Sequence, residues 1–235
     1  MTRRAIWKSI ADSLTTDIAG DKYAPGDKLP TEAELSARFG VNRHTVRRAL
    51  QDMSEKGLVL SRRGAGVFVA SKPADYPIGR RVRFTQNLRA AGRSASREII
   101  VLETRGADVR EAEALNIAPG DPVHVYEGLS KADGQPIALG RSVFPAARVP
   151  DILSVLNDVS SVTDALARCG ISDYTRASTR LTAKLATPTQ ALHLRLRDNA
   201  PILRTVNINV DPNGVPIEYG HTWFAGDRVT LTVEL

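Results

Sequence analysis

Basic side chains crowd one short segment of the chain, FGVNRHTVRRAL at residues 39–50, which contains Arg43, His44, Arg47 and Arg48. A guanidinium group donates two parallel hydrogen bonds, so arginine suits phosphate oxygens and the edge of guanine. Arg43 and Arg47 are four residues apart, and a helix would place them on one face. These residues therefore predict binding to a polyanion, and the major groove of duplex DNA is wide enough to accept such a helix.

The positive charge of the whole chain is concentrated around this segment. The net charge is +6; residues 1–72 contain 13 Lys and Arg against 8 Asp and Glu, and the rest of the chain is nearly neutral. A basic surface fits a solvated face as well as a nucleic-acid partner. The distribution nevertheless favours a polyanion-binding module joined to a nearly neutral one.

Two short helices joined by a glycine turn are expected to position the cations. Thr31 and Glu34 have the spacing of a capping box at the start of the first helix, and Gly40 ends that helix. Asn42 can cap the second helix. A buried face of the second helix is predicted from the helical spacing of Val46, Ala49, Leu50 and Met53. The arginines then lie on the opposite side, which is typical of a helix-turn-helix that inserts its second helix into DNA.

A third helix and a hairpin complete the expected module. The helix spans residues 5–19, with an apolar stripe of Ile6, Ile10, Leu14 and Ile18. The hairpin is predicted from LVLSRRGAGVFVA, whose basic tip contains Arg62, Arg63, Gly64 and Gly66. Glycines allow the backbone to approach DNA closely, and Arg63 can enter a narrow minor groove.

The order of these features resembles a known family. PGDKLPTEAELSARFGVNRHTVRRALQDMSEKGLVLSRRGAGVFV closely resembles the winged-helix domain of GntR-family transcription regulators, over residues 5–70. The resemblance implies that the family's DNA-contacting positions are Arg43, His44, Thr45, Arg47, Arg63 and Gly64. Our candidate interface also includes Thr31, Asn42, Arg48, Arg62 and Gly66. A family arginine on the preceding helix is replaced by Ala33, and each arginine here could alternatively be a surface charge or part of an ion pair.

An internal repeat marks the second part of the chain. Residues 72–79 contain two prolines and are expected to link a domain at 1–71 to a domain at 80–235. The segments 115–144 and 194–224 both read as a helix end, a strand, a DG or NG turn and a returning strand. With further strands near 98–104, 174–184 and 229–234, the repeat predicts one largely antiparallel sheet with helices on it, an α+β domain.

This second part resembles the UTRA ligand-sensing domain, which is chorismate-lyase-like in fold and follows the DNA-binding part in the HutC branch of the GntR family. The resemblance covers residues 79–235, and DYPIGRRVRFTQNLRAAG and STRLTAK also look like PhnF-type regulators of phosphonate utilisation. The fold prediction is therefore α+β: an N-terminal winged helix-turn-helix joined to a C-terminal antiparallel-sheet UTRA domain.

A ligand pocket is implied by the same resemblance. In sugar-phosphate-sensing members two arginines clamp the phosphate, but those positions here are Gly128 and Ser130, and Gly140 replaces an acidic residue. Other residues could hold an anion: Arg180 and Lys184 alternate on one strand and share a face, and a helix start is expected near residues 85–87. The candidate effector residues are Phe84, Thr85, Gln86, Asn87, Ser130, Arg141, Ser161, Thr163, Arg180, Lys184 and Glu218. A solvated sheet face is the alternative for Arg180 and Lys184, and a simple helix cap is the alternative for Ser161.

The predicted function is a sequence-specific DNA-binding transcription regulator. We expect a homodimeric repressor on a palindromic duplex operator, released by a small anionic metabolite such as a phosphonate or a phosphate ester. A lyase-like enzyme and an effector-independent DNA-binding protein are the alternatives. The sequence has no nucleophile motif, phosphate loop or metal-ligand spacing, so no catalytic residue, metal or cofactor is expected.

The remaining reactive side chains read as structural. The histidines, His44, His124, His193 and His221, are scattered, and Cys169 follows the helical apolar pattern of Val162 and Leu166. A single cysteine excludes an intrachain disulfide and fits a reducing cytoplasm. No run of 18 apolar residues is present, so no membrane partner is expected.

Overall fold

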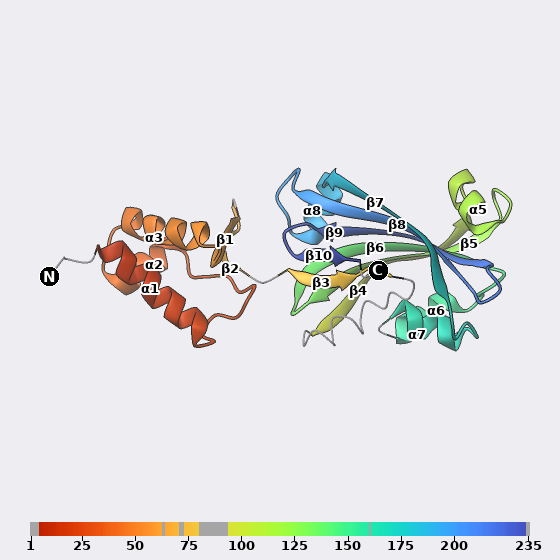
Figure 1. Ribbon diagram of the computed structural model, residues 1–235, viewed down its shortest axis with the longest axis horizontal. Helices are drawn as coiled ribbons and strands as arrows, with labels where there is room; N and C mark the ends of the chain where they lie inside the picture. Colours follow the sequence, from red (N-terminus) through yellow and green to blue (C-terminus); the bar gives the residue numbers. More distant parts are fainter. Residues whose placement is uncertain (1–4, 63, 71–72, 80–93, 160, 234–235) are drawn as a thin grey trace. The chain divides into compact units, whose positions relative to one another are not determined.

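The computed structural model describes the chain except residues 1–4, 63, 71–72, 80–93, 160 and 234–235 (Figure 1). The chain divides into two compact units, Met1–Lys72 and Pro73–Leu235. Each unit has its own buried apolar clusters, so each unit can be described as a separate domain.

The first unit is a three-helix domain with a β-hairpin. Its elements are α1 (Ile6–Ala19), α2 (Glu32–Phe39), α3 (Arg43–Glu55), β1 (Val59–Arg62) and β2 (Gly66–Val69), with the two strands antiparallel. The predicted helices and hairpin are confirmed. Leu14, Leu35, Val46 and Met53 are fully buried and join the three helices into one core, against which the paired Val59 and Val69 also pack.

A six-stranded antiparallel sheet dominates the second unit. Its order is β4-β5-β6-β9-β8-β7, with β4 at Ala95–Gly106, β5 at Pro122–Ala132, β6 at Gln135–Pro145, β7 at Thr175–Leu185, β8 at Pro201–Val210 and β9 at Pro216–Ala225. Short helices pack on it: α5 (Val109–Leu115), α6 (Ile152–Asp158), α7 (Val162–Arg168) and α8 (Pro188–Leu194). This confirms the predicted α+β class.

The two faces of the sheet are covered differently. Helices α5 and α8 pack on the face that carries Val125, Leu139 and Val143, which we call the helix face. Helices α6 and α7 pack on the other face, beside Tyr126 and Phe144. We call this second face the cavity face (Figure 1).

The internal repeat is confirmed by the topology. In each copy a strand, a short helix and a hairpin follow one another: β4-α5-β5-β6 and then β7-α8-β8-β9. Strands β6 and β9 pair at the centre of the sheet. Outward from this pair the first copy contributes β6, β5 and β4, and the second copy contributes the matching strands β9, β8 and β7. Gly134 and Gly214 have positive φ in the hairpin turns (74° and 79°), as the DG and NG signals predict. The second unit therefore has an approximate two-fold axis between β6 and β9.

Two expectations about strands were wrong. Strand β3 (Ala74–Pro77) lies inside the expected 72–79 connector, and it pairs in parallel with β10 (Val229–Thr232). The strand near 229–234 therefore belongs to a separate two-stranded sheet and not to the main one. Parallel pairing joins segments that are far apart in sequence, so local composition could not reveal it.

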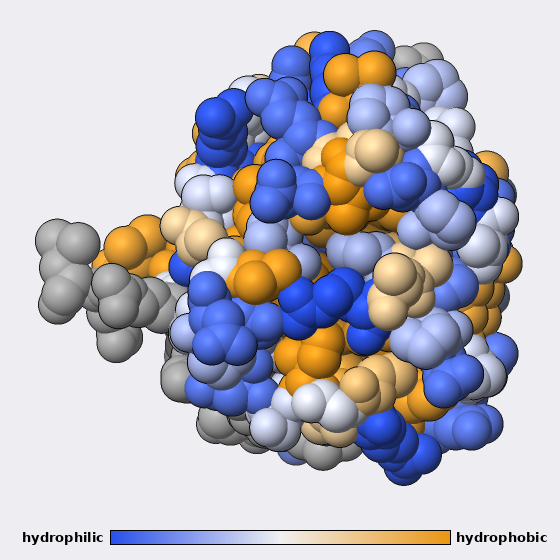
Figure 2. Space-filling model, turned by 90° about the vertical axis from the view of Figure 1, so that its right-hand side faces the viewer, coloured by the Kyte–Doolittle hydropathy of each residue, from blue (hydrophilic) through white to orange (hydrophobic). Residues whose placement is uncertain are grey.

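The surface of the second unit carries exposed apolar side chains on several elements: Val109 on α5, Leu181 and Leu185 on β7, and Leu192 on α8. On the face shown in Figure 2, apolar and hydrophilic side chains are intermixed. Single exposed apolar residues are normal on protein surfaces. The polar side chains of the second unit that lie close together line a cavity on one face of the sheet.

Candidate functional site

The start of α2 is fixed by the predicted capping box. The Thr31 hydroxyl accepts a hydrogen bond from the Glu34 backbone N–H at 3.3 Å, and the Glu34 carboxylate accepts one from the Thr31 backbone N–H at 2.7 Å. Gly40 ends the helix with a left-handed φ of 63°, a conformation that costs glycine little. The turn between α2 and α3 is therefore encoded by local residues.

The start of α3 is capped by Asn42, also as predicted. Its side-chain oxygen accepts hydrogen bonds from the backbone N–H and the hydroxyl of Thr45, both at 2.9 Å. The opposite side of the helix is exposed at Arg43, His44 and Arg47. One side of α3 thus holds the domain together, and its first turns present cations to solvent.

Arg47 is already engaged within the domain. Its guanidinium donates two hydrogen bonds to the Glu32 carboxylate, from Nε at 3.0 Å and from Nη2 at 2.7 Å. These hydrogen bonds hold the pKa of Glu32 below its usual value. The Arg47 side chain stays 62% exposed, so the pair orients the guanidinium and leaves it accessible to a ligand.

Arg48 has a different environment from Arg47. Its guanidinium lies over the ring of Trp7 on α1, 4.9 Å from the ring centroid, which is a cation–π distance. The hairpin of β1 and β2 is the wing of the winged-helix domain, and at its tip Gly64 and Gly66 have positive φ (75° and 113°). The side chain of Arg62 and the whole of Arg63 lie outside the described residues.

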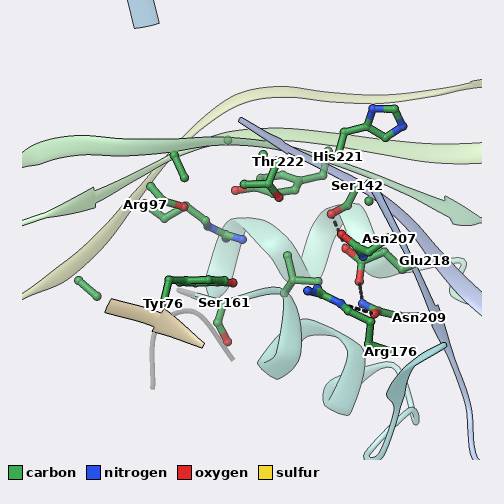
Figure 3. A pocket seen from close by; sticks show the side chains of 18 of the residues that line it. Tyr76, Arg97, Ser142, Ser161, Arg176, Asn207, Asn209, Glu218, His221 and Thr222 are labelled. Atoms are coloured by element: carbon green, nitrogen blue, oxygen red, sulfur yellow. Dashed lines mark hydrogen bonds between the residues drawn. The ribbon is translucent and has the colours of Figure 1, made fainter. Parts of the chain in front are cut away.

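A cavity of about 140 Å³ lies on the cavity face of the second unit (Figure 3). Its lining comes from β3, α7 and all six strands of the main sheet. The polar or charged side chains that line it include Tyr76, Ser96, Arg97, Ser130, Ser142, Ser161, Arg176, Asn207, Asn209 and Glu218. The His221 ring points to the other side of the sheet in Figure 3.

A chain of buried hydrogen bonds organises one side of the cavity. The Glu218 carboxylate accepts a hydrogen bond from the Ser142 hydroxyl at 2.5 Å and another from the Asn209 amide at 2.7 Å. The Asn209 side-chain oxygen in turn accepts one from Arg176 Nε at 3.3 Å. Figure 3 shows these contacts as dashed lines. Glu218 is therefore held by two donors, which makes a buried carboxylate tolerable.

Arg97 is anchored on the other side of the cavity. Its Nη2 donates to the backbone carbonyls of Leu156 and Val159, both at 2.7 Å. Its guanidinium carbon lies 4.9 Å from the centroid of the Tyr126 ring. Burial raises the pKa of Tyr126, and the nearby Arg97 charge opposes that shift. The Arg97 Nη1 atom is buried and has no hydrogen-bond partner among the described residues.

Glycines make room for two of the lining side chains. A Cβ atom at Gly128 would lie 1.7 Å from the Tyr126 hydroxyl, and one at Gly220 would lie 2.7 Å from the Asn207 amide nitrogen. No larger residue fits either position without a shift. The Tyr126 ring therefore fills the space at Gly128, one of the two positions where sugar-phosphate-sensing relatives are expected to carry an arginine. Burial raises the pKa of Tyr76, which also lines the cavity, to about 12.

Some predicted effector residues lie in this cavity. Ser130, Ser161 and Glu218 line it, and Ser161 also caps α7 by accepting a hydrogen bond from the Asp164 N–H at 3.0 Å. Thr163 shares a hydrogen bond of 2.8 Å with the hydroxyl of Tyr174, which lines the cavity. Phe84, Thr85, Gln86 and Asn87 lie outside the described residues.

Other predicted effector residues are outside the cavity. Arg141 is 3.5 Å from both Glu111 and Glu127 in ion pairs, on the helix face. Arg180 is exposed and lines a separate groove with Arg110 of α5, and Lys184 is exposed on the same side of β7. Strand alternation placed Arg180 and Lys184 on one face, but it could not tell which face of the sheet that would be.

The sequence reasoning missed Arg97, Arg176, Asn207, Asn209 and the tyrosines of the cavity. One signal could have found the arginines. Arg97 precedes Arg176 by the same number of residues as Pro122 precedes Pro201, so the arginines occupy matching places in the two copies of the repeat.

Among the helices that the structure describes, we find no candidate for a membrane-spanning segment.

Comparisons with known proteins agree with this architecture. A family model of the UTRA domain matches residues 90–230, and a model of bacterial regulatory proteins of the gntR family matches residues 7–69. An uncharacterized HTH-type transcriptional regulator of Rhizobium meliloti, RB1450, is 37% identical over 98% of this chain and 95% of its own length. The probable transcriptional regulator PhnF of Escherichia coli is 34% identical over 97% of this chain and 94% of its own.

A solved structure extends the similarity to the fold. The crystal structure of PhnF from Mycobacterium smegmatis superimposes with a TM-score of 0.69 at 28% identity, covering 96% of this chain and 98% of that one. The similarity to proteins named as transcription regulators therefore extends over both units of this chain. The chain belongs to the GntR family of bacterial transcription regulators, in its HutC branch, with a winged-helix domain followed by a UTRA domain.

Proposed function

We propose that this regulator is a repressor that binds a palindromic operator as a homodimer and is released by a small anionic metabolite. The observation that carries the DNA-binding half is the capped start of α3. There Arg43, His44 and Arg47 are exposed opposite a fully apolar buried face. A protein that acts on operator DNA in a bacterium works in the cytoplasm, and we place it there.

Relatives support the direction of regulation. The M. smegmatis relative is named the HTH-type transcriptional repressor PhnF, and it is 30% identical over 88% of this chain. NagR of Bacillus subtilis, 26% identical over 96% of this chain, is also named a transcriptional repressor. Because several relatives that align over most of this chain are named repressors, repression is the direction that we propose.

The geometry of operator reading supports the proposed dimer. A single α3 spans only a few base pairs, whereas two of them can read half-sites about one helical turn, ~34–36 Å, apart. A ligand in the cavity changes the operator affinity only if it binds unequally to the operator-competent and operator-incompetent states. Linkage then requires operator DNA to weaken ligand binding by the same factor.

The effector half is supported by the charge of the cavity. Arg97 and Arg176 line it, and neither forms an ion pair among the described residues. The Glu218 carboxylate in the same cavity is bound to Ser142 and Asn209 and not to either arginine, so an anionic ligand would supply the ion-pair partner of the two arginines. The similarity to regulators named PhnF fits a phosphonate or a phosphate ester as that ligand.

DNA binding can be tested with a duplex that the protein itself selects from a random pool. Fluorescence anisotropy should show tight binding that weakens steeply with salt, because phosphate contacts release counterions. Arg47→Ala should weaken binding to the selected duplex about 10- to 100-fold, since a base-reading arginine contributes on that scale. Arg180→Ala, an exposed arginine of the other unit, is the matched control and should bind like the unmodified protein.

The two outcomes of this experiment separate cleanly. Unchanged operator affinity in Arg47→Ala would remove Arg47 from the reading surface. A selection that enriches no duplex, even at low salt, would overturn the DNA-binding proposal as a whole.

A further inference from the structure

The internal repeat relates the two arginines of the cavity. Arg97 on β4 pairs with Ser130 on β5, and Arg176 on β7 pairs with Asn209 on β8. The spacing from Ser130 to Asn209 equals the spacing from Arg97 to Arg176, so both pairs occupy matching places in the two copies. The strand positions that carry the two arginines are therefore related by the approximate two-fold axis between β6 and β9.

This relation restricts where the arginines can act. Strand positions related by a two-fold axis lie on opposite sides of it, and strand pairing places both arginines on the cavity face. In Figure 3, Arg97 and Arg176 enter the cavity from opposite sides with their guanidinium ends turned toward the centre. A ligand group that lies between them in the cavity faces both guanidinium groups.

Hydrogen-bond donors remain unused at this place. Arg97 Nη1 and Asn207 Nδ2 are buried without a hydrogen-bond partner among the described residues, and Asn207 is only 3% exposed. An unpaired buried donor is costly, and a site with two such donors suits a ligand with more than one acceptor oxygen. The carboxylate in the cavity, Glu218, already accepts from Ser142 and Asn209, so its charge is partly compensated.

We propose that Arg97 and Arg176 clamp one tetrahedral anionic group, a phosphonate or a phosphate monoester, on the approximate two-fold axis of the second unit. The proposal rests on the ligand-sensing half of the proposed function. A tetrahedral group presents three oxygens and up to two negative charges, so each guanidinium can bind different oxygens of the same group.

The rest of the ligand is oriented by the residues that differ between the copies. Glu218 and Asn207 of the second copy match Ala138 and Gly128 of the first. At these two positions the first copy has no polar side chain, whereas the second offers a carboxylate and an amide. A ligand whose hydrogen-bond donors lie toward Glu218 and whose carbon chain lies toward Ala138 fits this asymmetry.

Isothermal titration of the full chain with methylphosphonate tests the clamp, because this probe has a single anionic group. Arg97→Gln and Arg176→Gln should each weaken methylphosphonate binding about 10- to 100-fold, the scale of a lost charged hydrogen-bond pair. If the arginines bound two separate anionic groups, only one variant would weaken this probe. Equal binding by the unmodified protein and both variants would overturn the clamp, as would failure of the unmodified protein to bind either methylphosphonate or inorganic phosphate.

Matched controls separate binding from folding. Arg180→Gln changes an arginine four residues from Arg176 on the same strand but on the helix face, and it should bind the probe normally. Arg97 also donates hydrogen bonds to the backbone carbonyls of Leu156 and Val159. The stability of Arg97→Gln is therefore checked by thermal unfolding. Among the described residues, Arg176 donates to the side chain of Asn209 and to no backbone carbonyl. If Arg97→Gln is unstable, binding by Arg176→Gln therefore decides whether the clamp is present.

The double variant and the ligand series sharpen the result. With one shared group the two losses are coupled and not additive, so the double variant should lose less than the product of the single losses. Affinity for methylphosphonate should rise as pH rises through its second ionisation, and acetate should bind more weakly. Binding of phosphoethanolamine and of aminoethylphosphonate is compared at equal concentration. The comparison shows whether the site prefers a phosphate ester or a phosphonate. Acetate binding as tightly as methylphosphonate would contradict the tetrahedral group.

Failure of the clamp and failure of the sensor give different results. If methylphosphonate binds through both arginines but leaves operator affinity unchanged, the clamp stands and the proposed effector response fails. If a neutral compound releases the operator equally from the unmodified protein and from Arg176→Gln, the response stands and the clamp is overturned.

Discussion

Arg47 on α3 and Arg97 in the cavity are both cations at a candidate binding site, but they are held in different ways. The Arg47 side chain is 62% exposed and is paired with one carboxylate, Glu32. Arg97 is half-buried and is fixed by two backbone carbonyls and the ring of Tyr126. An exposed, weakly held cation suits a long polyanion, whereas a cation fixed inside a small cavity selects a ligand by size and geometry.

The comparison extends to the two units that carry these cations. The first unit builds its interface from neighbours in sequence, residues 31 to 66. The second builds its cavity from strands at both ends of a repeat, so Arg97 and Glu218 meet only in the fold. Destabilising one unit at a time shows whether the two units unfold independently.

The largest expected effect comes from emptying the core of the first unit. Leu35 is fully buried, so Leu35→Ala should destabilise the first unit by about 2–5 kcal/mol through lost packing and a cavity. DNA binding should fall with it, while methylphosphonate binding to the second unit remains. Denaturant unfolding followed by Trp7 fluorescence, in a Trp223→Phe background, measures the change in the first unit.

Leu156→Ala is the matched change in the second unit, where Leu156 is also fully buried. It should leave the Trp7 transition in place and shift only the transition of the second unit, which Trp223 fluorescence reports in a Trp7→Phe background. Simultaneous shifts of both transitions in either variant would show that the units unfold as one.

A smaller effect is expected from the buried ion pair on the helix face. Arg105 donates two hydrogen bonds of 2.7 Å to Glu111, and these hold the pKa of Glu111 below its usual value of 4.5. A carboxyl with a depressed folded-state pKa contributes stability above the unfolded pKa and loses it as pH falls through the folded pKa. The second unit should therefore lose this stability only as pH falls below about 4.5.

Glu111→Gln tests this contribution while keeping the capping box, which accepts glutamine. Because the Arg105 side chain is 29% exposed, the expected cost at neutral pH is about 2 kcal/mol, below the ~3–5 typical of a fully buried pair. The variant should also flatten the acid dependence of unfolding below pH 4.5. Glu32→Gln, which breaks the exposed pair with Arg47, is the control and should change stability little. A Glu32→Gln cost equal to that of Glu111→Gln would contradict the contrast between exposed and buried pairs.

These contrasts also explain what could be predicted from the sequence. The cap of α2 at Thr31, the cap of α3 at Asn42 and the turn at Gly40 depend on residues within a few positions, and all are confirmed. The repeat was readable because DG and NG turns are local signals. The pairing of β3 with β10 was not readable, because its partners lie at opposite ends of the second unit.

The cavity was the least predictable part. Ser130 and Glu218 were found through the family resemblance, whereas Arg180 and Lys184 were expected beside the ligand and lie on the other face. The sequence gives the alternation of a strand but not which face the helices leave open. Tyr126 is a further case, since only the fold shows its ring filling the space at Gly128.

The smallest expected effect is loss of a helix cap. Thr31→Ala removes the hydroxyl that accepts from Glu34, and it should destabilise the first unit by about 1 kcal/mol. Thr187→Ala removes the equivalent cap of α8 and should cost the second unit a similar amount. Thermal unfolding of both variants makes the comparison, and a large loss in only one would mean that the cap there has another role.

The most direct test of the account is operator binding by the full chain, titrated with methylphosphonate. We predict that methylphosphonate weakens binding of the unmodified protein to its selected duplex, that Arg176→Gln binds the duplex normally but no longer responds, and that Arg47→Ala binds it poorly from the start. Operator affinity that is indifferent to Arg47, or an anion response that survives without Arg176, would contradict the account.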